Sequence, residues 1–530
     1  MIASIFDLGL VILLSFFAQV FAKQPNILVV VVDDLGYQDV GFRGSHIKTP
    51  NIDKLAQEGV ILENHYVMEV CTPSRGSLLT GRYAIRTGLW KGLLKPNEEF
   101  GLDLNETLLP EMLKRNGYST HGVGKWHVGM YTWHHTPAMR GFDTFFGLFT
   151  GEQDYFTHKK AGRLDLRNSY INGDGELIDE LRSDLNGQYN TGLFSDAAVK
   201  VIQTHDTSKP LFLYLAYTAP HIPLEAPKED VEKFAQHISG KRKTYAAMVS
   251  AMDQGVGEVV DAMEKKGLLD NNILVFTSDN GAYFKSKGSN FPLRGGKSSF
   301  FEGGVRGVSF VNSPLLQKTG YTNTNLHHVS DWYATFQMLA GDQPDQHKKA
   351  QLPLDGVNIW PSISENEPCR EEVLLGFRDP VLRLDPRGNW GRRRAEFYKD
   401  RNLTSDFLLT GGGSKLAQDY FVIRWKKWKL LSGTSVEIQG WTSENGTDQF
   451  KKFSDNKGRM FETSLAVGNF LFDLSSDLRE ETNVANLHPN IVRHLLDKKE
   501  GYRNRMKPIK ESRYSGGIAA HGGLKPWIEL

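Results

Sequence analysis

Three short hydrophobic runs stand out along the chain, and each ends in polar residues. These nearly continuous apolar runs are residues 26–32 (NILVVVV), 211–217 (LFLYLAY) and 272–278 (NILVFTS). Such runs are typical of parallel strands that are buried on both faces of a sheet. Residues 118–123 (YSTHGV) are a plausible fourth strand. The pattern therefore predicts a buried, mainly parallel sheet.

Helical patterns lie between these strands. Residues 51–58 follow a proline, residues 108–116 have apolar positions at helical spacing, and residues 244–265 form a long amphipathic stretch. Strands that alternate with helices predict an α/β core in which helices flank the sheet. Residues 162–188 are polar, and we interpret them as a surface insertion.

The sequence changes character after about residue 368. Arg- and Gly-rich loops appear, followed by predicted strands at residues 420–431 and 470–474 and a closing helix at residues 488–505. A chain of 530 residues exceeds one typical hydrophobic core. We therefore predict a larger α/β domain over residues 23–368 and a smaller α+β domain over residues 369–530.

The first 22 residues are typical of a cleaved signal peptide. Residues 8–22 are almost entirely apolar, but the run is short for a membrane span, and Ala22 suits a cleavage site. Asp7 and the absence of a basic residue before the run leave an uncleaved anchor as the alternative. No later segment resembles a membrane helix, so we expect no stable membrane insertion. Glycosylation triplets at Asn105, Asn402 and Asn445 agree with passage through the secretory pathway.

The overall charge excludes a nucleic-acid-binding protein of the usual kind. Lys and Arg number 63 and Asp and Glu number 62, which gives a net charge of +1. Proteins that neutralise many phosphates concentrate positive charge. A small anionic substrate remains compatible with this balance.

Two predicted strands end in pairs of oxygen-bearing side chains. Asp33 and Asp34 follow the first strand, and Asp279 and Asn280 follow the strand at residues 272–278. Ligands bind beyond the carboxyl ends of strands in open α/β sheets, and carboxylate and amide oxygens suit Ca²⁺ or Mg²⁺. The alternative is that these residues are ordinary turn or cap residues.

The segment CTPSRGSLLTGR at residues 71–82 places a cysteine at the start of a predicted helix. Pro73 suits a first helical turn, where its missing N–H costs nothing. Free N–H groups and the positive end of the helix dipole favour an anion beside Cys71. Arg75 adds a fixed positive charge within the first turns.

This segment resembles the core signature of the formylglycine-dependent sulfatases, in which an enzyme of the secretory pathway oxidises the cysteine to an aldehyde. The resemblance extends from about residue 24 to residue 530 and is closest to arylsulfatase B and its relatives. It also rests on NILVVVVDDLG, GKWH, APH and TSDNG, in the order in which the family has them, and on HHVSDWY, KWKLL and LFDL later in the chain. The resemblance implies an alkaline-phosphatase-like core with a smaller C-terminal domain.

The resemblance also implies a role for each site residue. Ca²⁺, with Mg²⁺ as the alternative, would be held by Asp33, Asp34, Asp279, Asn280 and the modified Cys71. The implied catalytic residues are Cys71 (as formylglycine), Arg75, Lys125, His127, His221 and Lys297. Lys125, His221 and Lys297 would contact the sulfate, His127 would help to release it, and His221 would protonate the leaving alcohol. Lys125 and His127 are two residues apart, so an extended segment points both side chains the same way.

The implied function is hydrolysis of a sulfated carbohydrate or an aryl sulfate, with N-acetylgalactosamine 4-sulfate groups of glycosaminoglycans as candidates. The formylglycine-generating enzyme is the implied maturation partner, and the lysosome or the extracellular space is the implied location. Two alternatives stay open: a phosphomonoester or phosphonate hydrolase with the same core, and a catalytically silent protein that binds sulfated glycans.

Two features depart from the family pattern. Glu69 and Val70 precede Cys71, where relatives usually carry a small residue or proline and an apolar residue, and this bears on recognition by the maturing enzyme. Cys369 is the only other cysteine, whereas relatives typically have several disulfides. A Cys71–Cys369 disulfide is the alternative fate of the two thiols.

Overall fold

The computed structural model gives the fold of most of the chain after residue 22. It describes residues 23–530 except for 235–237, 344–351, 380–382, 385–419, 440–441, 443–452, 455–459, 462, 511–523 and 527–530. The predicted signal peptide and the triplets at Asn402 and Asn445 lie outside the described residues. Asn105 is described and exposed.

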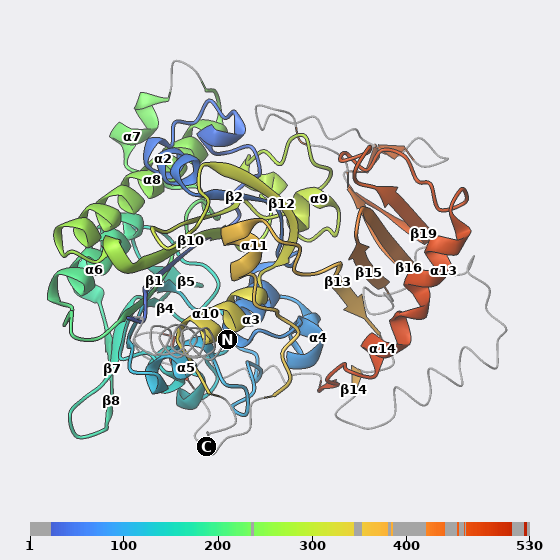
Figure 1. The fold of residues 1–530 in the computed structure, drawn as a ribbon. Coiled ribbons are helices and arrows are strands. Elements are labelled where there is room, and N and C mark those ends of the chain that lie inside the picture. The colour runs from blue at the N-terminus through green and yellow to red at the C-terminus, as the bar shows by residue number, and fades with distance from the viewer. Residues whose placement is uncertain are drawn as a thin grey trace, which may run out of the picture.

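A ten-stranded sheet forms the centre of the larger domain (Figure 1). Its strand order is β12-β2-β11-β10-β1-β9-β3-β4-β7-β8. The strands are β1 (Asn26–Val32), β2 (Val60–Tyr66), β3 (Ser119–Lys125), β4 (Thr144–Leu148), β7 (Arg167–Ile171), β8 (Leu177–Leu181), β9 (Leu211–Ala216), β10 (Asn272–Ser278), β11 (Ser309–Asn312) and β12 (Tyr321–His328).

The middle of this sheet is parallel, as predicted. Strands β10, β1, β9, β3 and β4 run in the same direction, whereas β11, β7 and β8 pair antiparallel with their neighbours. In the register of β1 and β10, Val32 lies opposite Ser278. The residues that follow these two strands therefore leave the sheet side by side.

The segment that we interpreted as a surface insertion is partly sheet. Residues 162–188 include β6 (Arg163–Leu164), and β7 and β8, which extend one edge of the central sheet. The interpretation did not include β7 and β8 as strands, because their sequences, RNSYI and LIDEL, carry polar residues on a half-buried edge rather than a continuous apolar run.

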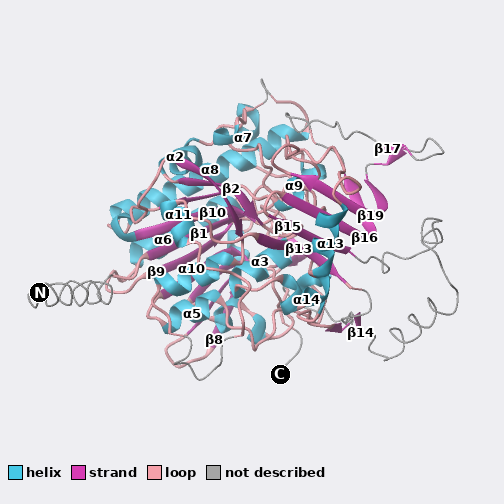
Figure 2. Ribbon diagram, turned by 45° about the vertical axis from the view of Figure 1, so that its right-hand side comes forward, coloured by secondary structure: helices cyan, strands magenta, loops and turns pink. Residues whose placement is uncertain are grey.

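Helices cover both faces of the sheet (Figure 2). The side chains of β1 alternate between two cores: Ile27 and Val31 belong to one, and Leu28 and Val32 belong to the other. One face packs against α2 (Pro50–Glu58), α6 (Asn190–Thr204) and α8 (Lys241–Lys265), and the other against α3 (Cys71–Thr80), α5 (Leu109–Arg115) and α10 (Asp331–Leu339). Shorter helices are α4 (Ala84–Thr87), α7 (Lys228–Lys233), α9 (Glu302–Val305) and α11 (Trp360–Glu365), and 3₁₀ turns are η1 (Gly41–Arg43), η2 (Leu89–Lys91), η3 (Trp133–His135), η4 (Pro137–Arg140), η5 (Ser183–Leu185), η6 (Leu269–Asn271) and η7 (Phe284–Ser286).

A second sheet forms the smaller C-terminal domain, on the right in Figure 1. It has four antiparallel strands, in the order β13 (Glu372–Arg378), β15 (Tyr420–Trp425), β16 (Trp428–Gln439) and β19 (Thr463–Asp473). The predicted closing helix is two consecutive helices, α13 (Pro489–Asp497) and α14 (Lys499–Arg503). Two-stranded pairs are β5 (Lys159–Lys160) with β6, β14 (Arg383–Leu384) with β20 (Ile509–Lys510), and β17 (Phe453–Ser454) with β18 (Met460–Phe461).

Apolar residues join the second sheet to the larger domain. Phe301 and Val305 of the α9 region pack with Val373, Val422 and Leu431 of the sheet. Across the described residues, every helix is too short or too polar to cross a membrane.

Candidate active site

Cys71 is the first residue of α3, as the sequence predicted. The preceding Val70 is extended (φ −149°, ψ 165°) and caps the helix without a side-chain hydrogen bond. Pro73 lies in the first turn, and all ten residues of the helix are buried. The first-turn N–H groups and the dipole of this buried helix favour a negative charge beside Cys71.

The two aspartates that follow β1 lie beside Cys71. The Sγ atom of Cys71 donates a hydrogen bond to Oδ1 of Asp33 over 3.3 Å. Asp34 has a positive φ of 60°, a strained conformation for a residue other than glycine. Potential ligand atoms of Asp33, Asp34, Cys71 and His221 lie within 4.8 Å of one another, and all four residues are buried.

Asp279 and Asn280 join this group from the end of β10. Oδ1 of Asp279 accepts a hydrogen bond from the backbone N–H of Asp34 at 3.4 Å, and Nδ2 of Asn280 donates to Oδ1 of Asp34 at 2.7 Å. Asp279 stays outside the tightest cluster, and its Oδ2 binds Arg75. The four predicted oxygen-bearing residues therefore lie together beyond the sheet.

Two lysines form ion pairs with the aspartates that follow β1. Nζ of Lys125 lies 2.6 Å from Oδ2 of Asp33, and Nζ of Lys297 lies 2.6 Å from Oδ1 of Asp34. The ammonium of Lys297 also lies 3.3 Å from Sγ of Cys71. Both lysines are buried, so their charges act in a region that is poorly screened by water.

Arg75 holds the base of the site. Its Nε and Nη2 atoms lie 3.0 and 2.8 Å from Oδ2 of Asp279, and its Nη1 donates to the carbonyl of Lys125 at 3.2 Å. A weaker hydrogen bond of 3.4 Å reaches the hydroxyl of Tyr214. Arg75 is fully buried, so these contacts fix both its position and its charge.

His127 is held in one tautomer. Its Nε2 donates to the carbonyl of Leu94 at 3.0 Å, while Nδ1 is buried and has no hydrogen-bond partner among the described residues. The backbone of His127 has a positive φ of 58°, and its carbonyl accepts a hydrogen bond from Thr72 at 3.1 Å. The unprotonated Nδ1 is therefore a free proton acceptor in a fixed ring.

His221 follows β9 and faces Asp34. Its Nδ1 donates to the carbonyl of Ile222 at 2.5 Å, which fixes the tautomer of the ring. Its Nε2 lies 3.7 Å from Oδ2 of Asp34, and its Nδ1 lies 3.6 Å from Oε2 of Glu152. The ring therefore connects the buried aspartate with a carboxylate nearer to the surface.

Burial and the neighbouring charges set the protonation states of the anionic groups. Burial raises the pKa of the Cys71 thiol, and Asp279 and Asp33 raise it further. Burial would also raise the pKa of Asp33, but Lys125, His221, Arg75 and Lys297 outweigh it and hold the pKa well below its usual value. Cys71 is therefore a protonated thiol, which is a weak nucleophile, and it lies beside the ionised carboxylate of Asp33.

Among the basic side chains of the site, Lys297 is charged, whereas the two imidazoles are neutral. Burial would lower the pKa of Lys297, but Asp34, Cys71 and Asp33 outweigh it, so the pKa is raised. Burial, followed by Lys297, lowers the pKa of His221 to about 4, and burial with Lys125 lowers that of His127 well below its usual value. Both imidazoles are neutral at pH 7.

The donor set fits a hard divalent cation. Oδ2 of Asp34 and Oδ1 of Asn280 are buried oxygens without a hydrogen-bond partner among the described residues. An unpaired buried oxygen is costly unless a ligand satisfies it. With the carboxylates of Asp33 and Asp279 they form an oxygen-rich group that suits Ca²⁺ or Mg²⁺.

Comparison with known proteins decides the family. A family model described as Sulfatase matches residues 25–341, more than half of the chain. The chain belongs to the sulfatases. Arylsulfatase J of Mus musculus is 37% identical over 492 residues, which cover 92% of this chain and 77% of that protein. N-acetylgalactosamine-6-sulfatase of Homo sapiens is 30% identical over 400 residues, which cover 73% of this chain and 74% of that protein.

A solved structure has the same architecture. The crystal structure of Ps i-CgsB in complex with k-i-k-neocarrahexaose aligns with a TM-score of 0.69 and 29% identity, covering 92% of this chain and 94% of that one. The predicted membership of the formylglycine-dependent sulfatases is confirmed, and so is the predicted fold of a large α/β core with a smaller C-terminal domain. The chain is a sulfatase, an enzyme that hydrolyses sulfate esters.

Several residues of the sulfatase site escaped the sequence analysis. Leu94 orients His127 through a backbone carbonyl, which no sequence pattern reveals. Gly151 packs against the ring of His127, and Glu152 contacts His221. Both follow β4, and the signal that could have located them is their position just after a strand that neighbours β3, where Lys125 lies.

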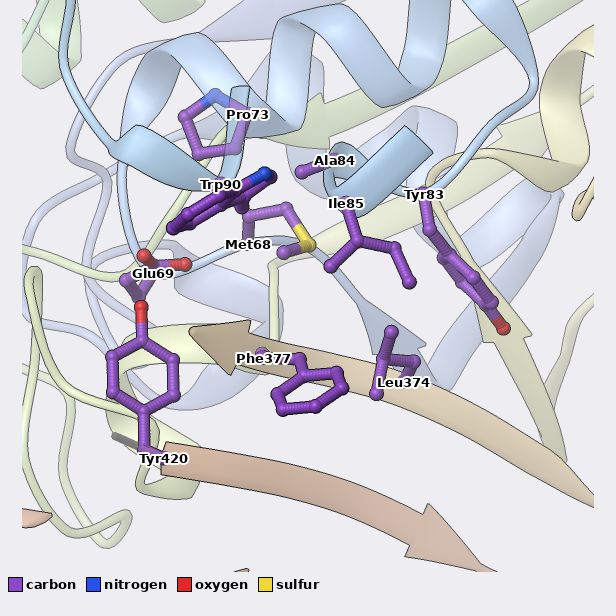
Figure 3. Close-up of a pocket in the computed structure, with 11 residues that line it drawn as sticks. Met68, Glu69, Pro73, Tyr83, Ala84, Ile85, Trp90, Leu374, Phe377 and Tyr420 are labelled. Carbon is purple, nitrogen blue, oxygen red and sulfur yellow. The ribbon is translucent and has the colours of Figure 1, made fainter. Parts of the chain in front are cut away.

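A small cavity separates the start of α3 from the C-terminal sheet (Figure 3). Met68, Trp90 and Phe377 are among the residues that line it, and the hydroxyl of Tyr420 points toward Glu69 in this view. Its free volume is about 10 Å³, room for about one water molecule. The cavity is therefore a packing gap between the domains, and a sugar cannot enter it.

The two cysteines do not pair. Both are free, and Sγ of Cys369 instead contacts the carbonyl of Leu326 at 3.5 Å. The alternative of a disulfide between Cys71 and Cys369 was therefore wrong.

Proposed function

We propose that this sulfatase cleaves O-sulfate esters with a formylglycine made from Cys71 and with a bound Ca²⁺. The observation that carries the proposal is the position of Cys71 at the N-terminus of α3. Its Sγ is 3.3 Å from a carboxylate oxygen of Asp33 and 3.3 Å from the ammonium of Lys297. As a buried thiol with a raised pKa, the side chain has little reactivity of its own.

Formylglycine in its hydrated form would supply a hydroxyl nucleophile, and the cation would supply positive charge next to the sulfate. The residues that would hold the cation are Asp33, Asp34, Asp279, Asn280 and the modified residue 71. The two unpaired oxygens on Asp34 and Asn280 support this set. Mg²⁺ remains the alternative ion.

Three cationic side chains would bind the sulfate and stabilise charge on its oxygens. Lys125 and Lys297 form ion pairs with the two aspartates that follow β1, and Arg75 forms one with Asp279. Because these charges are already in place and buried, little reorganisation is needed as negative charge develops in the transition state. A sulfate ester also meets the free N–H groups of α3 here.

The two histidines would move the protons. The hydrogen bond from Nε2 to Leu94 leaves Nδ1 of His127 free to accept a proton from residue 71, which releases the sulfate. In its neutral form His221 carries its only proton on Nδ1, at the carbonyl of Ile222, so Nε2 would have to take up a proton when the sulfate ester binds and would then deliver it to the oxygen of the leaving alcohol.

We infer that the substrate is a sulfated sugar. Relatives of this chain include an N-acetylgalactosamine-6-sulfatase, and a similar solved structure holds k-i-k-neocarrahexaose. These names support a carbohydrate substrate, and N-acetylgalactosamine 4-sulfate in glycosaminoglycans remains the specific candidate from the sequence. An aryl sulfate serves as a general test substrate.

Maturation would precede folding of the site. Cys71 is only 1% exposed, so a formylglycine-generating enzyme has to reach it before the domain closes over it. That step belongs to the secretory pathway, and the exposed Asn105 supports the same route. The lysosome and the extracellular space are both compatible destinations.

Substitution of the two cysteines tests the proposal. Cys71→Ala should leave a folded protein whose turnover of 4-methylumbelliferyl sulfate falls to background, because the nucleophile is lost. Cys369→Ala is the matched control and should keep normal turnover, since Cys369 is not one of the predicted site residues and its Sγ contacts the carbonyl of Leu326. Near-normal turnover by Cys71→Ala would contradict the mechanism, and faster turnover of the matched aryl phosphate by the wild type would favour a phosphomonoesterase instead.

A further inference from the structure

A chain of contacts leads from the buried site to the surface through His221. Oδ2 of Asp34 lies 3.7 Å from Nε2 of His221, and Nδ1 of the same ring lies 3.6 Å from Oε2 of Glu152. Glu152 in turn forms an ion pair with Lys160. The side chains become more exposed along this path: Asp34 is 0% exposed, His221 is 10%, and Glu152 and Lys160 are each 30%.

A tight hairpin presents Lys160 at the outer end of this path. Lys160 ends β5, and the next two residues, Ala161 and Gly162, have positive φ values of 52° and 78°. Two consecutive positive φ values are typical of a type I′ turn, which holds a hairpin in a fixed twist. Arg163 is the residue paired with Lys160 across this turn. Lys160 is therefore held by backbone geometry rather than carried on a loose loop.

Lys160 also lies within electrostatic reach of the sulfate site. Burial, followed by the charge of Lys125, lowers the pKa of Lys160. Lys125 is fully buried against Asp33, whereas the ammonium of Lys160 forms its ion pair with Glu152 nearer to the surface. The neighbouring Lys159 is exposed, and its side chain lies on the other side of the strand.

This path leads outward from His221, which protonates the leaving alcohol in the proposed function, and the inference rests on that function. The oxygen that His221 would protonate lies at Nε2, next to the buried Asp34, and the sugar that carries this oxygen has to extend from there toward solvent. Exposure increases from His221 to Glu152 and Lys160, so the sugar extends along this path. Glu152 and Lys160 are the residues beyond that ring. The group next to the scissile sulfate ester therefore meets one carboxylate and one ammonium.

We propose that Lys160 binds a second anionic group of the substrate, so that the site prefers a polyanionic glycan to a singly charged sulfate ester. The second group is a uronate carboxylate or a further sulfate, since an ammonium binds either. Glu152 competes with that group for Lys160 in the free enzyme. Binding of the substrate exchanges the internal ion pair for one with the glycan.

Competition experiments with matched disaccharides test this proposal. Chondroitin sulfate disaccharides, 4- or 6-sulfated, are used as inhibitors of 4-methylumbelliferyl sulfate hydrolysis by the wild-type enzyme. The ratio of Ki for the uronate methyl ester to Ki for the free acid measures the benefit of the carboxylate. The ratio of Ki for the monosulfated ester to Ki for the disulfated ester measures the benefit of a second sulfate. We expect at least one ratio to be about fivefold, the size of a partly exposed charge pair.

Substitutions of Lys160 and Glu152 should change the ratio of the Ki values in opposite directions. Lys160→Met should bring the responding ratio down to about 1, and Glu152→Gln should raise it because the competing carboxylate is gone. Lys159→Met is the matched control and should leave the ratio unchanged. Glu152→Gln can alter basal turnover through its contact with His221. Each ratio compares two inhibitors of the same variant, so this effect cancels.

The outcomes separate the two proposals. Ratios near 1 in the wild type, or an unchanged ratio in Lys160→Met, would overturn the role of Lys160 while leaving the sulfatase mechanism standing. An absence of 4-methylumbelliferyl sulfate hydrolysis by the wild type would instead contradict the proposed function, and this inference with it. The ratio that responds identifies the second group as carboxylate or sulfate.

Discussion

Gly151 lies directly against the imidazole of His127. A β-carbon on Gly151 would be 2.3 Å from Cε1 and 2.5 Å from Nε2 of that ring. Such distances are far below ordinary contact, so any side chain at position 151 has to displace the histidine. The ring is also tied to the carbonyl of Leu94, and displacement would break this hydrogen bond. The glycine is thus a steric condition for the position of the proposed base.

Gly151→Ala should therefore impair turnover more than stability. A shift of about 1 Å in a catalytic group can cost roughly a hundredfold in rate, and we expect a loss of roughly ten- to a hundredfold in kcat. Gly173→Ala is the control, because its β-carbon would meet no atom within 4 Å. Steady-state kinetics with 4-methylumbelliferyl sulfate checks this, and normal kcat in Gly151→Ala would contradict the role of His127.

Calcium should stabilise the fold through the oxygen group at the ends of β1 and β10. A ligand that binds only the native state at one hundred times its Kd adds about 2.7 kcal/mol to the free energy of unfolding. Thermal unfolding with excess EGTA and with added Ca²⁺ measures this effect without reference to activity. Asp34→Asn should abolish the calcium-dependent rise in Tm. Asp39→Asn should keep it, since Asp39 binds Arg242 and Tyr245 instead.

Lys429 should be a main contributor to the attachment of the C-terminal sheet. Its ammonium is fully buried, 2.8 Å from Glu302 and 2.9 Å from Glu480. Removal of one partner from a buried ion pair costs about 3–5 kcal/mol, so Lys429→Met should lower the free energy of unfolding by that amount. Lys427→Met is the control, because Lys427 is half exposed and its ion pair with Asp473 is worth at most about 1 kcal/mol. Urea unfolding compares them, and equal losses would refute the account.

The buried histidine group at the other edge of the sheet should make stability fall in acid. Burial lowers the pKa of His65 and of His327 to about 3, and that of His328 well below its usual value. The charge of Arg370 adds to the shift of His327 and His328. The unfolded chain binds a proton at each histidine near pH 6.5, whereas the folded chain does not, so stability is complete above pH 6.5 and is lost as the pH falls toward 3.

A substitution isolates one histidine from the other titrating groups. At pH 5.5 each such histidine lowers the free energy of unfolding by about 1.4 kcal/mol relative to pH 8. His65→Gln should remove one of these contributions, because Gln keeps an acceptor for Nε1 of Trp332, 3.2 Å from His65. Urea unfolding at pH 5.5 and pH 8 measures the difference. An equal loss in the variant and the wild type would show that His65 does not titrate in this way.

The sequence predicted the centre of the fold better than its edges. Residues 26–32 and 272–278 are strands with the predicted bounds, because a short apolar run rich in β-branched residues is typical of a strand buried on both faces of a sheet. The edge strands β7 and β8 were missed, since half-buried polar strands lack this pattern. The position of Cys71 at the start of α3 followed from Pro73.

The candidate site divides in the same way. Asp33, Asp34, Asp279 and Asn280 were predictable because they follow strands that end at the same edge of the sheet. Leu94 acts through its backbone, and Gly151 through the absence of a side chain, so neither has a chemical signature in the sequence. Glu152 and Lys160 acquire their meaning only from the hairpin that brings them to His221.

Mass spectrometry of the peptide that carries residue 71 tests the central claim most directly. The purified protein is digested after treatment with a hydrazide that traps aldehydes, and a sample from the same preparation is assayed with 4-methylumbelliferyl sulfate. We predict that residue 71 is found as the aldehyde, its hydrate or the trapped hydrazone. If an active preparation contained residue 71 only as an unmodified cysteine, the proposed nucleophile would be wrong.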